Sequence, residues 1–121
     1  MLQGPKAGER APKVRLPDLE GKNVKLTDFR GKETLVLFWN PGCGFCEQML
    51  PDLKEWEANR SEGAPERLVI SAGALEANKE TGLSSKVVLD QEFAAGRAFG
   101  ASGTPSAVHV DENGNLDTYR S

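Results

Sequence analysis

The sequence predicts an α/β domain in which a mixed β-sheet is flanked by helices. Short runs of β-forming residues alternate with helical stretches along most of the chain, which is typical of parallel strands joined by crossovers. One run, Thr34–Trp39, is apolar or β-forming at every position, as a central strand covered on both faces should be. A turn at Asp111–Asn115 near the end predicts an antiparallel hairpin.

Length and charge limit the organisation and the partners. The 121 residues fit one domain, 1–121, in which residues 1–12 are a loose N-terminal arm rich in Gly and Pro. The net charge is −3 and the basic residues are scattered, so we expect no nucleic-acid partner. No apolar run reaches the length of a membrane span, and the first residues do not resemble a signal peptide.

The first half of the chain predicts a hairpin, a strand and a long helix. Val14–Leu16 and Val24–Leu26 alternate apolar and polar residues around a turn, which predicts a small hairpin, and Thr27 or Asp28 caps the helical turn that follows. After the strand Thr34–Trp39, residues 43–59 predict a helix. Its buried stripe is Met49, Leu53 and Trp56, and Pro51 is expected to kink it.

The second half repeats the alternation of strands and helices. We predict strands at Arg67–Ser71, Lys86–Asp90, Ser106–Val110 and Leu116–Tyr119, and helices at Leu75–Lys79, closed by Thr81–Gly82, and at Gln91–Phe99. The second of these helices is expected to bury Phe93, Ala94, Ala98 and Phe99. No closing helix follows the last strand in this sequence.

Both cysteines lie where the central strand gives way to the long helix. Cys43 opens the helix, whose unpaired N–H groups and dipole stabilise a thiolate, so its pKa is expected below the free value of about 8.5. Cys46 follows one turn later on the same face, close enough to form a disulfide with it, and Gly44 leaves room beside the first sulfur. An acidic, exposed thiol followed by a shielded one suits thiol–disulfide exchange. A zinc site, for which the chain offers only two cysteines and one distant histidine, a structural disulfide and two inert thiols remain alternatives.

Nearly the whole chain resembles the thioredoxin-like superfamily. The matching segments are "GERAP" at 8–12, "LPDLEGKNVKLTDFRGK" at 16–32, "LVLFWNPGCGFC" at 35–46, Pro51 in the helix and "FGASGTPSAVHVDENG" at 99–114. Within that superfamily the chain looks most like the redoxin group and the membrane-tethered, extracytoplasmic reductases of the TlpA type. The resemblance implies a thioredoxin fold with an extra N-terminal β-hairpin, and a C-terminal helix that this chain lacks.

The resemblance also implies residue roles. Cys43 would attack, Cys46 would resolve, Trp39 would pack beside the pair, and Pro105 would follow a cis bond, with Thr104 offering backbone groups to an extended substrate. Pro41, Gly44 and Phe45 would support substrate binding. The implied activity is that of an oxidoreductase that acts on protein disulfides, takes electrons from a protein dithiol, and has no cofactor beyond its own redox-active disulfide. An extracytoplasmic location and a membrane tether outside this chain are implied too.

Three departures from thioredoxins proper affect these expectations. Leu37 stands where they have a buried aspartate, so Glu47 is the nearest candidate acceptor for the proton of the second thiol. Phe45 replaces a proline between the cysteines, which makes the surface more apolar and affects partner choice. The absence of a final helix would leave one sheet face open, or covered by a partner.

Two other functions remain open. A peroxiredoxin-like peroxidase would attack peroxide with Cys46, but Cys43 stands where that motif has a hydroxyl residue. A non-enzymatic module could hold copper(I) between the two thiols, although no third ligand is evident. His109, the only histidine, is expected to be a half-exposed strand residue rather than a ligand.

Overall fold

The computed structural model describes residues 8–59, 65–101 and 103–120. Its main sheet has five strands in the order β5-β4-β3-β6-β7, in which β3 is parallel to β4 and antiparallel to β6. These strands are β3 (Thr34–Trp39), β4 (Glu66–Ser71), β5 (Lys86–Leu89), β6 (Ser106–Val110) and β7 (Leu116–Arg120). Two more strands, β1 (Arg15–Pro17) and β2 (Asn23–Lys25), form a separate antiparallel hairpin. The predicted mixed sheet and hairpin are therefore both present.

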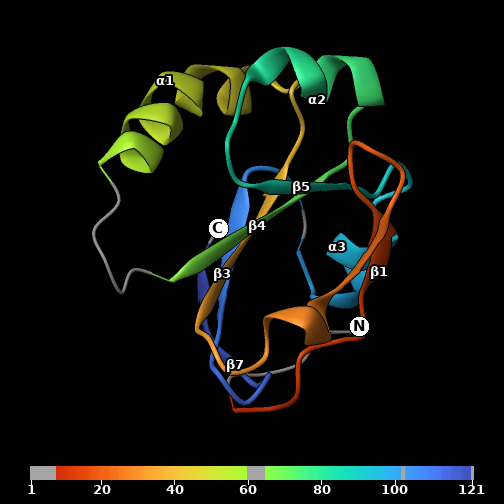
Figure 1. The fold of residues 1–121 in the computed structure, drawn as a ribbon, viewed down its shortest axis with the longest axis vertical. Coiled ribbons are helices and arrows are strands. Elements are labelled where there is room, and N and C mark those ends of the chain that lie inside the picture. Colours follow the sequence, from red (N-terminus) through yellow and green to blue (C-terminus); the bar gives the residue numbers. More distant parts are fainter. Residues whose placement is uncertain (1–7, 60–64, 102, 121) are drawn as a thin grey trace.

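Four helical segments complete the described fold. They are the 3₁₀ turn η1 (Leu26–Phe29) and the helices α1 (Gly44–Ala58), α2 (Leu75–Thr81) and α3 (Ala94–Ala98). Figure 1 looks toward β5 and shows α1 and α3 on opposite sides of the sheet, with α1 and α2 together at one end. No helix follows β7, and no helix is long and apolar enough to cross a membrane, within the three described ranges.

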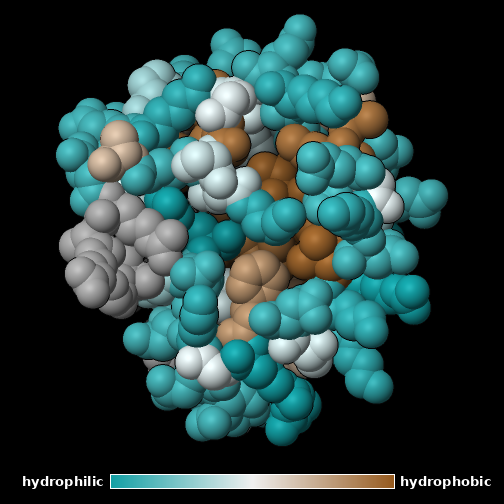
Figure 2. Space-filling view, in the orientation of Figure 1, coloured by the Kyte–Doolittle hydropathy of each residue, from teal (hydrophilic) through white to brown (hydrophobic). Residues whose placement is uncertain are grey.

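Side chains of β3 alternate between two packed clusters. Val36 and Phe38 join the cluster on the side of the hairpin and α3, where Phe99 also lies. Trp39 packs on the other side, under α1, with Val69 of β4. In the space-filling view hydrophilic side chains cover most of the visible face, and hydrophobic ones gather near its centre (Figure 2).

The side of the sheet under α1 is less completely covered than the sequence predicts. Met49 and Leu53 of the predicted stripe are half-buried, and Trp56 is 43% exposed, so the expectation of a buried Trp56 is wrong. The reason is tertiary: the helix has the expected periodicity, but the neighbours of Trp56, among them the Arg67 guanidinium 4.8 Å from its ring centroid, cover the ring only in part. The helix continues past Pro51, which cannot donate to the carbonyl of Glu47.

Helix α3 is shorter than predicted because Phe93 adopts a left-handed backbone conformation with φ 59°. This turns the Phe93 ring toward Phe38, with the ring centroids 6.3 Å apart, and the Asp90 carboxylate accepts hydrogen bonds from the N–H groups of Ala95 and Gly96. Ala94 and Ala98 are exposed, so their predicted burial is wrong, while Phe99 is buried as expected.

Part of the N-terminal arm is anchored. Residues 1–7 of the predicted loose arm 1–12 lie outside the described residues. The N–H of Gly8 donates to the carbonyl of Leu116 at 2.6 Å, and the N–H of Leu116 donates to the carbonyl of Glu9 at 2.7 Å. Residues 8–11 therefore form backbone hydrogen bonds with the β6–β7 turn and the start of β7, and this part of the arm is not loose.

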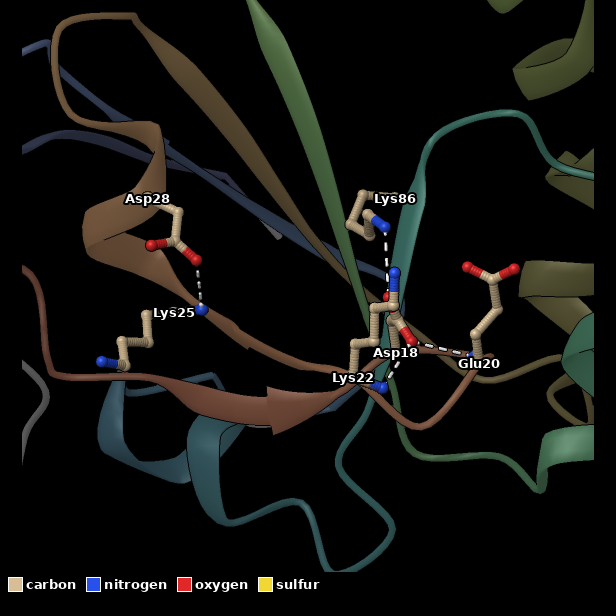
Figure 3. Close-up of polar contacts among 6 residues, drawn as sticks. All are labelled: Asp18, Glu20, Lys22, Lys25, Asp28 and Lys86. Atoms are coloured by element: carbon tan, nitrogen blue, oxygen red, sulfur yellow. Dashed lines mark hydrogen bonds and ion pairs between the residues drawn. The ribbon is translucent and has the colours of Figure 1, made fainter.

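The Asp18 carboxylate ties the hairpin to the edge strand β5. Asp18 is buried and accepts hydrogen bonds from the N–H groups of Glu20 at 2.8 Å and Lys22 at 3.0 Å, and from Lys86 Nζ at 3.2 Å (Figure 3). A short bridge also joins Asp18 to Val88 of β5. The hydrogen bond from Lys22 is the largest of the contributions that lower the pKa of Asp18.

We predict that Asp18→Asn destabilises the protein more at neutral pH than in acid. A carboxyl with a lowered folded-state pKa stabilises the fold above its unfolded value of about 3.9, and that stabilisation is lost as the pH falls through the folded pKa. Urea unfolding at about pH 7 and about pH 3 measures the difference. Glu20→Gln, an exposed acid in the same turn, is the matched control. An equal loss at both pH values would contradict the assignment.

Candidate active site

Asn40 organises the turn between β3 and α1. The N–H of Cys43 donates to its backbone carbonyl at 2.9 Å, and the N–H of Gly42 donates to its side-chain Oδ1 at 2.9 Å. These two hydrogen bonds close the chain into a tight turn directly after Trp39, the last residue of the buried strand. Cys43 is thereby placed at the N-cap of α1.

The Cys43 thiol is partly exposed and sits among free N–H donors. Its backbone is extended, with φ −85° and ψ 130°, so the side chain meets the first turn of the helix. The N–H of Cys46 is the main cause that lowers the pKa of Cys43, and the Cys46 thiol and the N–H of Phe45 act in the same direction. The positive end of the helix dipole favours the thiolate as well.

The Cys46 thiol has a contrasting environment. Cys46 is fully buried and clusters with Trp39, Val69 and Val87, while Leu37 packs against this cluster. Burial raises the pKa of Cys46, because an apolar environment disfavours the charged sulfur. Both cysteines are present as free thiols. Of the two, Cys43 is the one that ionises more readily and that an external molecule reaches.

A loop distant in sequence completes the site beside Cys43. The peptide bond between Thr104 and Pro105 is cis, as the resemblance implies, and it lies just before β6. Cys43 Sγ lies 3.7 Å from the Thr104 carbonyl oxygen, to which the thiol donates. The geometry therefore brings Thr104 and Pro105 to the reactive sulfur.

The remaining predicted site residues lie around this centre in different settings. Phe45 is 72% exposed, Gly44 is exposed, and Trp39 is buried against the Cys46 side of the pair. A methyl group added at Gly44 would meet nothing within 4 Å apart from its two neighbours in the chain. Glu47 is exposed and shares a shallow hollow with Trp39 and Pro41.

Gly73 is a supporting residue that the sequence analysis missed. A Cβ placed on it would lie 2.6 Å from Pro41 Cδ and 3.2 Å from Asn40 Oδ1, closer than packing allows. Its N–H donates to the Ser71 hydroxyl at 3.1 Å, and the N–H of the adjacent Ala72 donates to the carbonyl of Trp39 at 2.9 Å, which joins the segment after β4 to the end of β3. The two segments are far apart in sequence, and a lone glycine after a strand is too common a pattern to reveal the contact.

His109 stands apart from the cysteines. It is half-buried in β6 as predicted, and its Nε2 lies 3.1 Å from Glu33 Oε1, just before β3. Within the described ranges, no group of three or more His, Cys, Asp or Glu side chains is arranged to hold a metal ion.

Comparison with known proteins agrees with this geometry. Residues 6–120 match the family described as Redoxin. The chain is 32% identical over 114 residues to thiol-disulfide oxidoreductase ResA from Geobacillus thermodenitrificans, an alignment that covers 90% of this chain and 66% of the relative. It thus spans about two thirds of the length of the ResA proteins it matches.

Solved structures confirm the thioredoxin-like fold. The thioredoxin domain of a thiol-disulfide oxidoreductase from Bacteroides vulgatus superposes with a TM-score of 0.78 at 27% identity, over 98% of this chain and 91% of that one. A thiol:disulfide interchange protein from a Bacteroides species gives 0.77 at 27% identity, over 94% and 80%.

We predict that Gly73→Ala disturbs the turn that carries the cysteines. The added methyl collides with the rigid Pro41 ring, so the free energy of unfolding should fall by about 1–3 kcal/mol. The alkylation rate of Cys43 by iodoacetamide should change as well, because its turn must shift. Gly44→Ala, whose methyl meets no neighbour, should leave the stability nearly unchanged. Equal stabilities of the two variants would contradict the packing argument.

Proposed function

The chain belongs to the redoxin family, and from this membership and the geometry of its cysteines we propose that it is a thiol–disulfide oxidoreductase. The observation that carries the proposal is the contrast between the thiols: Cys43 is accessible with a lowered pKa, and Cys46 is buried with a raised one. This contrast separates an attacking sulfur from a resolving sulfur. The similarity to the ResA proteins, which are thiol-disulfide oxidoreductases, supports the same activity.

In the reductive direction the reaction has two exchange steps. The Cys43 thiolate attacks one sulfur of a substrate disulfide, a bond forms between Cys43 Sγ and that sulfur, and the other substrate sulfur leaves and takes up a proton. Cys46 then loses its proton, attacks Cys43 Sγ, and releases the second substrate sulfur as a thiol. The substrate gains two electrons and two protons, and the protein is left with a Cys43–Cys46 disulfide. A protein dithiol reduces it again, so the cycle needs no other cofactor.

The substrates we propose are proteins that present a disulfide in an extended segment. The backbone at Thr104 and Pro105 lies beside the Cys43 sulfur and is placed to receive such a segment. Phe45, which lies between the two cysteines in the sequence and is 72% exposed, would add an apolar contact. Pro41 and Gly44, both on the surface of the same turn, would border the contact.

The proton of Cys46 needs an acceptor in the second step. Leu37, which packs against the Cys46 cluster, has no side-chain group that can accept a proton. We propose Glu47 for this role, since it follows Cys46 directly in α1 and its carboxylate is exposed to exchange protons with water. We further propose an extracytoplasmic location and one domain over residues 1–121, in keeping with the redoxin resemblance.

The two alternative functions fit the geometry less well. A peroxidase of the kind considered would need Cys46 as the thiol that meets peroxide, but Cys46 is fully buried and burial raises its pKa. A copper(I) module would have to do without a third His, Cys, Asp or Glu ligand, since none joins Cys43 and Cys46 in the described part of the chain.

Serine substitutions test the two roles separately. Cys43→Ser should abolish reduction of a protein disulfide, because the buried sulfur that remains cannot reach the substrate. Cys46→Ser should instead accumulate a mixed disulfide between Cys43 and the substrate, because nothing resolves it. A disulfide-reduction assay measures the loss in Cys43→Ser, and mass spectrometry detects the mixed disulfide trapped by Cys46→Ser. Thermal unfolding verifies that both variants fold. Full activity in Cys43→Ser would overturn the proposal.

Phe45→Ala tests whether the exposed ring selects protein substrates. Stability should change by no more than about 0.5 kcal/mol, because the side chain is 72% exposed. The KM for a protein disulfide should rise several-fold, while the reduction rate of a small aromatic disulfide reagent should stay nearly the same. An equal loss with both substrates would point instead to an effect on the cysteine pair itself.

A further inference from the structure

A small apolar hollow lies where the N-terminal arm, η1 and the β6–β7 turn meet. Its apolar lining includes Leu26, Phe29 and Val110. Three basic side chains, those of Arg10, Lys13 and Arg30, also line it. The hollow measures about 80 Å³, far below the roughly 300 Å³ at which sites for drug-sized molecules begin. It therefore has room for one short apolar group.

Two of the basic side chains converge over Gly114, in the β6–β7 turn. A Cβ built on Gly114 would lie 3.2 Å from Arg30 Nε and 3.6 Å from Arg10 Nη1. The backbone of Gly114 has φ 86°, a left-handed conformation that side chains disfavour, so the space between the guanidiniums stays open. Two like charges held around one point repel each other, and an anion between them relieves that repulsion.

Backbone hydrogen bonds bring both arginines to this turn. The N–H of Ala11, the residue after Arg10, donates to the carbonyl of Gly114 at 3.0 Å. The N–H of Gly31, the residue after Arg30, donates to a carbonyl of the same turn at 2.8 Å. The meeting of the two charges is therefore built into the fold, because two segments distant in sequence are fixed on either side of one glycine.

The carboxylate that lines the same hollow is part of its own turn. Asp111 Oδ1 accepts hydrogen bonds from the N–H groups of Asn113 at 3.0 Å and Asn115 at 2.9 Å. These bonds hold the turn in shape. The three basic side chains outnumber this one acid around the hollow, so the local charge favours an anionic ligand.

We propose that the hollow binds a carboxylate carried on a short apolar group, with the apolar group inside and the carboxylate between Arg10 and Arg30. A guanidinium fork matches a carboxylate in two parallel hydrogen bonds, and the apolar walls favour a ligand whose charge adjoins an alkyl group. A free short-chain acid has this chemistry, and so does the last residue of a polypeptide that ends in an aliphatic side chain. Inorganic phosphate has the charge but nothing to fill the hollow.

The hollow lies at the opposite end of β3 from the cysteines. Thr34, the first residue of β3, lines it, whereas Trp39, the last residue, packs with Cys46. A ligand in the hollow would therefore leave Cys43 open to its substrate. Binding at this site is separate from thiol–disulfide exchange, so its test does not depend on redox activity.

The experiment titrates two matched pairs of ligands into the ¹⁵N-labelled protein and follows the backbone amides of Arg10, Arg30 and Gly114 by NMR. The pairs are isobutyrate with isobutyramide, and an acetylated Gly-Gly-Gly-Val peptide with its C-terminal amide. Each acid should bind about tenfold or more tightly than its amide, because the amide lacks the charge-assisted hydrogen bonds. Arg10→Gln and Arg30→Gln should each remove most of this ratio, whereas Arg15→Gln, at an exposed site on β1, should leave it unchanged.

The two acids distinguish the sources of the carboxylate. Tighter binding of the peptide acid than of isobutyrate would support the site and assign it to a chain terminus, and equal binding would support it and assign it to a free acid. Equal binding of acids and amides, no saturable shift, or an unchanged ratio in both arginine variants would overturn the proposal. Phosphate binding as tightly as isobutyrate would overturn it too. If Arg30→Gln does not fold, Arg30→Lys takes its place, because lysine loses the fork and the ratio should still fall.

Discussion

The hydrogen bond from the N–H of Cys43 to the carbonyl of Asn40, 2.9 Å long, is where the chain turns from the buried end of β3 into α1. The strand supplies a fixed starting point, because β4 and β6 hold it on both sides and Trp39 is fully buried. The turn can then be short, and the helix must begin at the first cysteine. The chemistry proposed for the pair depends on this junction, since a longer or looser turn would not keep Cys43 at a helix start.

The same junction explains why two cysteines one helical turn apart have opposite properties. Cys43 stands at the cap, where N–H groups converge and solvent has access, and the Thr104 carbonyl oxygen lies 3.7 Å from its sulfur. Cys46 points inward to Val69 and Val87. Neighbouring charged side chains are not needed for this asymmetry. Backbone donors and burial suffice, and both follow from how the strand meets the helix.

Much of this arrangement was predictable from the sequence because the signals are local. The apolar run at 34–39 and the paired alternations around residues 17–23 identify β3 and the hairpin, and the position of the cysteines after that run places them at a helix start. The cis bond at Pro105 followed from a family resemblance, not from composition. The central place of β3 in the sheet also agrees with the prediction.

The features that escaped prediction involve residues distant in sequence. Trp56 has the right helical spacing for burial, but burial depends on whether another element covers it, which periodicity does not reveal. Phe93 left the helix because its ring packs on Phe38, a contact that outweighs its helical propensity. Gly73 shows no local signal at all, since the atoms that forbid a side chain there belong to Pro41.

The central claim is that the junction makes Cys43 the more acidic thiol and Cys46 the less acidic one. A pH titration of the reduced protein by NMR, with ¹³C at the cysteine Cβ atoms, follows each thiol separately. The account predicts that the midpoint of Cys43 lies below the ordinary pKa of a free thiol and that of Cys46 above it. Coincident midpoints, or the reverse order, would contradict it.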